Sequence, residues 1–265
     1  MSYEHVQLTR DGHVATLTLN RPEARNAMTP AMGEEVRRAV AEVRADSSAR
    51  VLVVTGAGKA FSGGGDLGML ARDAGVSQGA GDGMGGPPRD FYRRYLSVQS
   101  LPIPTIAAIN GHAIGAGFCF ALACDVRIAA TDAKMGMTFT KLGIHPGMGA
   151  TYFLPRLIGS ARACELLFTG RIIEAAEAER LGIVSRVVAR DAFPAAVRQL
   201  ADEIAAAAPI AVRMVKRALY RGLEHSLEDA LDLESLQQSA TFHTADAREG
   251  IRAVMEKRPP QFTGR

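Results

Sequence analysis

Short apolar runs recur along the chain and are separated by stretches with helical spacing of apolar positions. Residues 6–9 and 14–19 alternate apolar and polar side chains around an Asp-Gly pair, which predicts a hairpin. Later runs are apolar almost throughout, as is typical of strands buried on both faces of a parallel sheet. These runs are residues 51–55, 105–109, 126–129 and 184–188. Since helical stretches separate them, the pattern predicts an α/β fold.

Signals for the start of helices complete this picture. Thr29 and Pro30 form an N-cap and first-turn pair, which predicts a helix to about residue 44. From residue 193 onward the pattern is almost wholly helical, with one helix before Pro209 and three after it. We therefore divide the chain into a core of residues 1–205 and a C-terminal helical region of residues 206–265. We expect the second region to mediate oligomerisation.

One uncharged stretch, residues 95–124, is long enough to cross a bilayer. Pro102, Pro104 and the Asn110-Gly111 pair break it into a strand, a turn and a short helix. A deeply buried segment is therefore the better interpretation, and we expect no membrane association. The first residues carry no apolar signal segment, and the three cysteines form no CxxC pair, so we expect a cytoplasmic protein.

Composition narrows the function classes. The 265 residues are 47% hydrophobic and 22% charged, which is ordinary for a globular protein. The net charge is +3, basic residues are spread along the chain, and there is no Trp, so we expect no nucleic-acid partner. No cysteine has a His at ligand spacing, and we expect no metal site.

Two glycine-rich turns carry the candidate chemistry. Residues 60–67 (AFSGGGDL) and 110–117 (NGHAIGAG) each follow a predicted buried strand and lead into a helix. Glycines allow close approach of a ligand to the backbone, and the start of a helix leaves N–H groups unpaired. The second turn enters residues 118–123, which are apolar on all sides and should be buried. The two turns together predict an oxyanion hole.

A third glycine-rich stretch, residues 75–86, holds six glycines and precedes Pro87-Pro88. This composition is typical of a mobile segment. It could be a passive linker or a lid, and its place just after the first turn favours the lid.

Several runs together resemble the crotonase (enoyl-CoA hydratase/isomerase) superfamily over nearly the whole chain. They are RPEARNAM, KAFSGGGDL, PTIAAINGHAIGAGFCFALACDVRIA, KLGIHPGMGATYFLPRLIG, CELLFTGRI, AERLGIVSRVV and DAREGIRAVMEKR. The resemblance implies a spiral of ββα units with a C-terminal helical layer, assembled as a homotrimer or hexamer. It implies an acyl-CoA substrate, with coenzyme A as part of that substrate and no separate cofactor.

The resemblance also assigns residues to the site. It places the two oxyanion N–H donors at Gly65 and Ala116, and coenzyme A contacts along Gly65, Asp66, Leu67 and Gly68. Arg25, and Lys257 from a neighbouring subunit, are implied as contacts to the phosphates of coenzyme A.

The sequence departs from the family at the positions of its acids. Adding water to an enoyl thioester needs a base and an acid, and family hydratases are similar in using two glutamates. Those positions here hold Cys119 and Phe139, and a third acidic position used by some members falls near Gly147. Efficient hydration is therefore doubtful.

Other groups could serve as acid or base. Cys119 could be a nucleophile, but its apolar neighbours favour an inert core thiol. His145 lies in a loop that borders the acyl pocket in the family and is our candidate for acid–base or polar contact. For four others we favour structural roles: Asp66 as a helix N-cap, Glu165 in an ion pair, His112 in a turn and His243 before the last helix.

Three functions remain open. The first is an acyl-CoA enzyme, of lyase or isomerase type, that keeps enolate stabilisation; decarboxylation of an acyl thioester on coenzyme A or a carrier protein suits it, because loss of CO₂ needs no protein base. The glycine-rich stretch has no lysine to hold a carboxylate, which weakens that idea. The second is a catalytically silent acyl-CoA-binding protein, and the third is a hydratase of very low activity in fatty acid metabolism.

Overall fold

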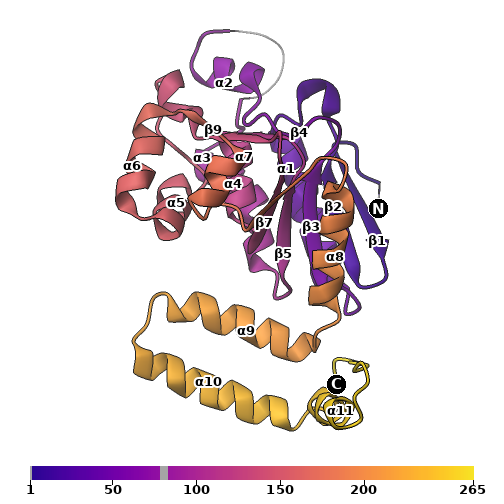
Figure 1. The fold of residues 1–265 in the computed structure, drawn as a ribbon. Helices are drawn as coiled ribbons and strands as arrows, with labels where there is room; N and C mark the ends of the chain where they lie inside the picture. The colour runs from indigo at the N-terminus through magenta and orange to yellow at the C-terminus, as the bar shows by residue number, and fades with distance from the viewer. Residues whose placement is uncertain (1, 78–82) are drawn as a thin grey trace.

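Two sheets of the computed structural model, which describes residues 2–77 and 83–265, organise the core (Figure 1). Over these residues the larger sheet has six strands in the order β1-β2-β3-β5-β7-β10, and the smaller has four in the order β4-β6-β8-β9. Only β1–β2 in the larger sheet and β8–β9 in the smaller are antiparallel pairs. The strands are β1 Val6–Asp11, β2 Val14–Leu19, β3 Val51–Gly56, β4 Ala60–Ser62, β5 Thr105–Ile109, β6 His112–Ile114, β7 Val126–Ala130, β8 Lys134–Gly136, β9 Ile172–Glu174 and β10 Arg186–Val188.

The sheets are linked by repeated ββα units. Strands β3, β5 and β7 each enter the larger sheet, and the strand that follows each of them enters the smaller one. The helices are α1 Pro30–Ala45, α2 Leu67–Asp73, α3 Pro88–Leu96, α4 Ala116–Leu122, α5 Ala150–Ile158, α6 Ser160–Thr169, α7 Ala175–Arg180, α8 Phe193–Ala205, α9 Pro209–Gly222, α10 Leu227–Phe242 and α11 Ala245–Met255. The predicted α/β spiral of ββα units with a C-terminal helical layer is confirmed.

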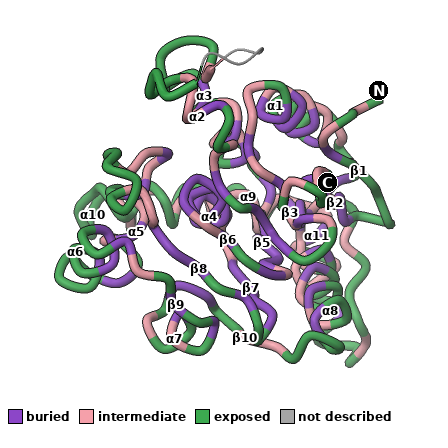
Figure 2. The backbone as a smooth tube through the Cα atoms, turned by 90° about the horizontal axis from the view of Figure 1, so that it is seen from above, coloured by how far each residue is buried: buried purple, intermediate pink, exposed green. Residues whose placement is uncertain are grey.

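The apolar runs become strands covered on both faces. Along β3, Val51 and Val53 pack in one cluster with side chains of α8, whereas Leu52 and Val54 pack in the other with α1 and α4. Every residue of α4 is buried, and Figure 2 shows this helix enclosed by the rest of the core. Because both faces of the sheet are covered, these strands lack the alternation of apolar and polar residues that a half-exposed strand would show.

Most local predictions are confirmed. The hairpin forms with β1 and β2, and the Thr29 hydroxyl accepts a hydrogen bond from the Met32 N–H at the start of α1. The run at residues 184–188 forms a shorter strand than predicted, β10, because residues 181–185 turn back from α7. The glycine-rich stretch predicted as a lid falls partly on residues 78–82, which lie outside the described residues.

Three C-terminal helices project from the core as an arm (Figure 1). The Asp125 carboxylate joins α9 to the core: it accepts hydrogen bonds from Lys216 Nζ at 2.7 Å and the Tyr220 hydroxyl at 2.7 Å. Large apolar side chains stay exposed on this arm, among them Leu223, Leu231, Leu236 and Val254. Helix α8 ends at Ala205, where we divide the chain; the role of residues 206–265 in oligomerisation stays a prediction.

None of the described helices combines the length and apolar character needed to cross a bilayer. The uncharged stretch of residues 95–124 instead forms the end of α3, β5, β6 and α4. Proline and glycine thus break this stretch into short elements, as the sequence predicts.

Candidate functional site

A cavity of about 280 Å³ lies where the two glycine turns meet. It is mostly apolar, and its polar side chains among the described lining residues are Tyr92, Thr138 and His145. The lining residues are Gly63, Gly64, Gly65, Leu67, Met69, Leu70, Met84, Phe91, Tyr92, Ile114, Gly115, Ala116, Thr138, Phe139, Leu142, Ile144, His145 and Met148. Three predicted catalytic residues, Gly65, Ala116 and His145, therefore surround one cavity.

Among the backbone N–H groups of this cavity, those of Gly65 and Ala116 have no partner among the described residues. Their neighbours are paired: Gly63 N donates to Arg25 O at 2.8 Å, and Gly115 N donates to Gly136 O at 2.7 Å. Buried backbone N–H groups are almost always paired. The N–H groups of Gly65 and Ala116 are therefore available to a ligand oxygen in this cavity.

The turns take this form because glycines allow them to touch. Gly64 has φ +96°, and a Cβ built there would lie 2.7 Å from the carbonyl oxygen of Ile114 in the second turn. Gly115, just before α4, has φ +52°. Both need the left-handed half of backbone space that only glycine occupies readily. Gly64 and Gly115, next to Gly65 and Ala116, therefore allow the two turns to lie in contact.

Gly117 provides a test of this close packing. A Cβ at residue 117 would lie 2.6 Å from Ser62 Cβ, inside the first turn. We expect Gly117→Ala to cost about 1–3 kcal/mol of unfolding free energy, because an extra methyl group must displace packed backbone. Urea unfolding measures it. Gly222→Ala is the matched control, since nothing lies within 4 Å of a Cβ built there. Equal losses of unfolding free energy in both variants would contradict the close packing of Gly117 against the first turn.

The acid positions of the family are apolar in this chain. Phe139 lines the cavity with its ring. Cys119 is fully buried, and its thiol lies 3.7 Å from Met137 Sδ and 3.4 Å from the carbonyl oxygen of Gly147. Burial strongly raises the pKa of the Cys119 thiol, so it stays protonated and a poor nucleophile. No Asp or Glu is among the described residues that line the cavity.

Tyr92 is a polar residue of this cavity that we did not predict. It lies on α3, and a Cβ built on Gly147 would lie 2.4 Å from the Tyr92 hydroxyl oxygen. Burial raises the pKa of Tyr92. His145 is on the exposed side of the cavity, where its Nδ1 lies 2.7 Å from the carbonyl oxygen of Pro146.

Only some of the residues that the resemblance implies as coenzyme A contacts line the cavity. Leu67 lines the cavity together with Gly65, whereas Asp66 and Gly68 are not among its described lining residues. The Asp66 carboxylate accepts the Met69 N–H at 3.1 Å and so caps α2, as expected.

The two implied phosphate contacts lie apart from each other. Arg25 is exposed beside the first turn, where its carbonyl oxygen accepts the Gly63 N–H. Lys257 follows α11, at the opposite end of the molecule from α2 (Figure 1). A contribution from Lys257 to this cavity would therefore have to come from another subunit, and it stays a prediction.

The other residues that we singled out have structural surroundings. Glu165 pairs with Arg171 at 2.9 Å, as expected. His112 is exposed at the start of β6, and His243 follows α10, where its Nδ1 lies 2.8 Å from the carbonyl oxygen of Ser239. No group of three or more His, Cys, Asp or Glu within the described part of the chain is placed to hold a metal ion.

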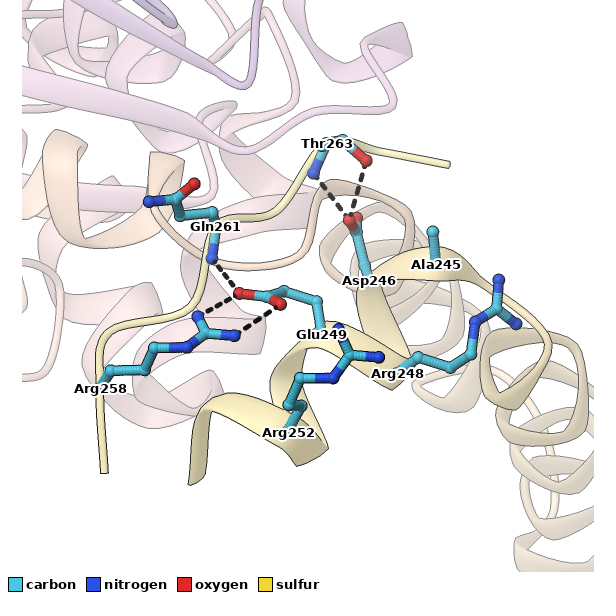
Figure 3. A pocket seen from close by; sticks show the side chains of 8 residues that line it. All are labelled: Ala245, Asp246, Arg248, Glu249, Arg252, Arg258, Gln261 and Thr263. Carbon is cyan, nitrogen blue, oxygen red and sulfur yellow. Dashed lines mark hydrogen bonds and ion pairs between the residues drawn. The ribbon is translucent and has the colours of Figure 1, made fainter. Parts of the chain in front are cut away.

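A larger hollow, of about 540 Å³, lies between α11 and the C-terminal tail (Figure 3). Its two carboxylates are already engaged. Asp246 accepts the Thr263 N–H at 2.7 Å, and Glu249 accepts hydrogen bonds from Arg258 and the Gln261 N–H. Arg258 holds the pKa of Glu249 down to about 2. These contacts tie the tail to α11, so we assign this hollow a structural role.

Comparison with known proteins agrees with the geometry. The family model described as enoyl-CoA hydratase/isomerase matches residues 9–265. The chain belongs to this family. It is 35% identical over 263 residues to a crotonyl-CoA hydratase of Syntrophomonas wolfei, covering 99% of each chain. It is 36% identical over 259 residues to a short-chain-enoyl-CoA hydratase of Clostridium acetobutylicum, covering 97% of each.

Solved structures also have the same fold as this chain. An enoyl-CoA hydratase from Bacillus anthracis superposes with a TM-score of 0.90 at 38% identity, covering 99% of this chain and 100% of that one. The resemblance to the crotonase superfamily is thus confirmed. Members of the enoyl-CoA hydratase/isomerase family act on acyl-CoA thioesters, which makes this chain an acyl-CoA enzyme by family.

Proposed function

We propose that this chain binds an acyl-CoA thioester with the carbonyl oxygen between the N–H groups of Gly65 and Ala116. The observation that carries the proposal is the pair of N–H groups left without a described partner in one apolar cavity. Hydrogen bonds from both would stabilise negative charge on that oxygen, at about 3 kcal/mol per donor in measured oxyanion holes. The thioester could then react through its enolate form.

We propose that the coenzyme A part of the substrate binds beside the first glycine turn. Coenzyme A is part of the substrate, and its contacts are proposed along Gly65, Asp66, Leu67 and Gly68. Arg25 is exposed beside that segment, as a phosphate contact requires. The exposed apolar side chains of α9, α10 and α11 support assembly as a homotrimer or hexamer, in which Lys257 would reach a neighbouring site.

The reaction that the site can catalyse depends on which acid–base groups line the cavity. General acid–base catalysis contributes about 10²–10⁴ to the rate of such reactions. Because no carboxylate is among the described lining residues, we propose that the chain hydrates enoyl thioesters only slowly. His145 is the candidate for acid–base or polar contact, from the exposed side of the cavity.

Decarboxylation is a second candidate, favoured by the apolar lining. Loss of CO₂ from a carboxylated acyl thioester forms the enolate without a protein base, and an apolar cavity destabilises the carboxylate that is lost. A catalytically silent acyl-CoA-binding protein keeps the same two donors without a reaction. Cytoplasmic localisation and a place in fatty acid metabolism stay predictions.

A panel of acyl thioesters distinguishes these functions. We would incubate the protein with crotonyl-CoA, methylmalonyl-CoA and butyryl-CoA and follow their masses. Hydration adds 18 mass units, decarboxylation removes 44, and a silent protein changes none, by the masses of water and CO₂. Rapid hydration of crotonyl-CoA would overturn the proposal that the missing carboxylates matter. If no acyl-CoA raises the melting temperature, binding itself is wrong.

A further inference from the structure

The Tyr92 hydroxyl is a polar group that the proposed mechanism leaves unused. It belongs to the lining of the cavity that holds the free N–H groups of Gly65 and Ala116. Among the described residues, the Tyr92 hydroxyl has no hydrogen-bond partner. A hydroxyl in an apolar cavity loses free energy unless a ligand or water pairs with it.

Gly147 makes room for this hydroxyl. A Cβ at residue 147 would lie 2.4 Å from the Tyr92 oxygen and 2.6 Å from its Cζ, so any other residue would displace the ring. The φ of Gly147 is not in the left-handed region, and no backbone constraint requires glycine there. The missing side chain is therefore explained by the space that Tyr92 occupies.

The surroundings of Tyr92 decide what it can do. Burial raises the pKa of Tyr92, so its hydroxyl is a donor rather than a base at neutral pH. Neither Lys nor Arg is among the described lining residues, so an ionised carboxylate at this point would lack a cation. A neutral hydroxyl or keto oxygen needs only the hydrogen bond.

The other polar side chains of the cavity are placed differently. A Cβ built on Gly115 would lie 3.8 Å from the Thr138 hydroxyl, so Thr138 lies beside the second oxyanion turn. His145 is exposed and close to the carbonyl oxygen of Pro146. Tyr92 is thus the hydroxyl of the part of the cavity that adjoins Gly147.

We propose that Tyr92, held against Gly147, is a specificity-determining hydrogen-bond donor that selects acyl thioesters carrying a neutral oxygen on the acyl group. This inference rests on the proposed function, because it requires an acyl thioester in the same cavity. The oxygen meant is one beyond the thioester carbonyl, which the N–H groups of Gly65 and Ala116 receive.

The test compares ligands that differ by one oxygen. Dissociation constants of 3-hydroxybutyryl-CoA and butyryl-CoA are measured calorimetrically for the wild type and for Tyr92→Phe. We expect Tyr92→Phe to weaken 3-hydroxybutyryl-CoA about five-fold, the equivalent of one neutral hydrogen bond, and to leave butyryl-CoA unchanged. Tyr3→Phe is the matched control, since that hydroxyl bonds to Glu42 at 3.0 Å, outside the cavity lining.

A second variant tests the geometry. Gly147→Ala should displace the Tyr92 ring and produce the same selective loss. The double variant should bind no more weakly than either single variant, because all three lose one hydrogen bond. If Tyr92→Phe binds 3-hydroxybutyryl-CoA as tightly as the wild type does, the assignment is overturned. Methylmalonyl-CoA is measured in the same way, and a loss of affinity confined to it would overturn the choice of a neutral oxygen. If neither ligand binds to the wild type, the proposed function itself fails.

Discussion

Ala116→Pro is expected to reduce turnover of any thioester that the panel identifies by about 10²–10³, the loss measured when one oxyanion donor is removed. Ala116 is the first residue of α4, and its N–H is unpaired among the described residues. Proline is well tolerated at this helix position because the missing N–H would have no partner in the helix. The substitution therefore removes one donor and leaves the helix intact. Initial rates at saturating substrate measure the effect.

Ser160→Pro is the matched control for this variant. Ser160 is the first residue of α6 and also follows a glycine, but it is exposed and outside the cavity lining. Both variants should melt near the wild-type temperature, and only Ala116→Pro should lose activity. Unchanged turnover in a folded Ala116→Pro variant would exclude this N–H as a donor. If the panel shows no reaction, the readout is the affinity for butyryl-CoA, which should fall while that for free coenzyme A stays constant.

The glycine turns were predictable because their chemistry is local. Each turn lies within eight consecutive residues, and glycine, the preceding strand and the following helix indicate that N–H groups stay open there. Which N–H groups serve as donors was implied by the resemblance to the family. The same holds for Thr29 at the start of α1, where cap and first turn are adjacent in sequence. Local rules of this kind need no knowledge of the tertiary fold.

Tyr92 was not predictable for the opposite reason. It is one of five tyrosines, and nothing in its neighbours distinguishes it from a core aromatic residue. The role that we propose for it depends on Gly147, a residue 55 positions later that the fold brings against its hydroxyl. From the sequence, Gly147 indicates only that an acid is absent. The structure shows that the space beside Gly147, which lies in a loop, is occupied by the Tyr92 hydroxyl from α3.

The C-terminal arm shows a third limit. Its helices were predicted from their spacing, and the capping box at Ser226 begins α10 as a sequence rule would have it. The exposure of Leu223, Leu231 and Leu236 was not predictable, because the same spacing serves equally for a helix packed on its own core. Periodicity identifies the apolar face of a helix without identifying its partner.

The double variant Cys119→Glu/Phe139→Glu is expected to gain hydration of crotonyl-CoA by about 10²–10⁴ over the wild type, the contribution of general acid–base catalysis. Phe139 already lines the cavity. The Cys119 thiol reaches the carbonyl oxygen of Gly147 at 3.4 Å, so a longer side chain from residue 119 would extend toward the Tyr92 end of the cavity. Two carboxyl groups would then supply the base for water and the acid for the α-carbon. Loss of the enoyl thioester absorbance measures the rate.

The control is Cys119→Gln/Phe139→Gln, which matches the size and polarity of the two glutamates but cannot transfer protons. Burial will raise the pKa of a glutamate at residue 119, since the site excludes water and the described lining offers no Lys or Arg. Hydration by the glutamate variant should therefore depend on pH, with activity rising as the carboxyl that serves as base loses its proton. Equal activity of the Glu and Gln variants would mean that residues 119 and 139 do not face the bound acyl group. A gain confined to the Glu variant, together with loss of that gain on adding Ala116→Pro, would place the carboxylates and the oxyanion hole around one substrate.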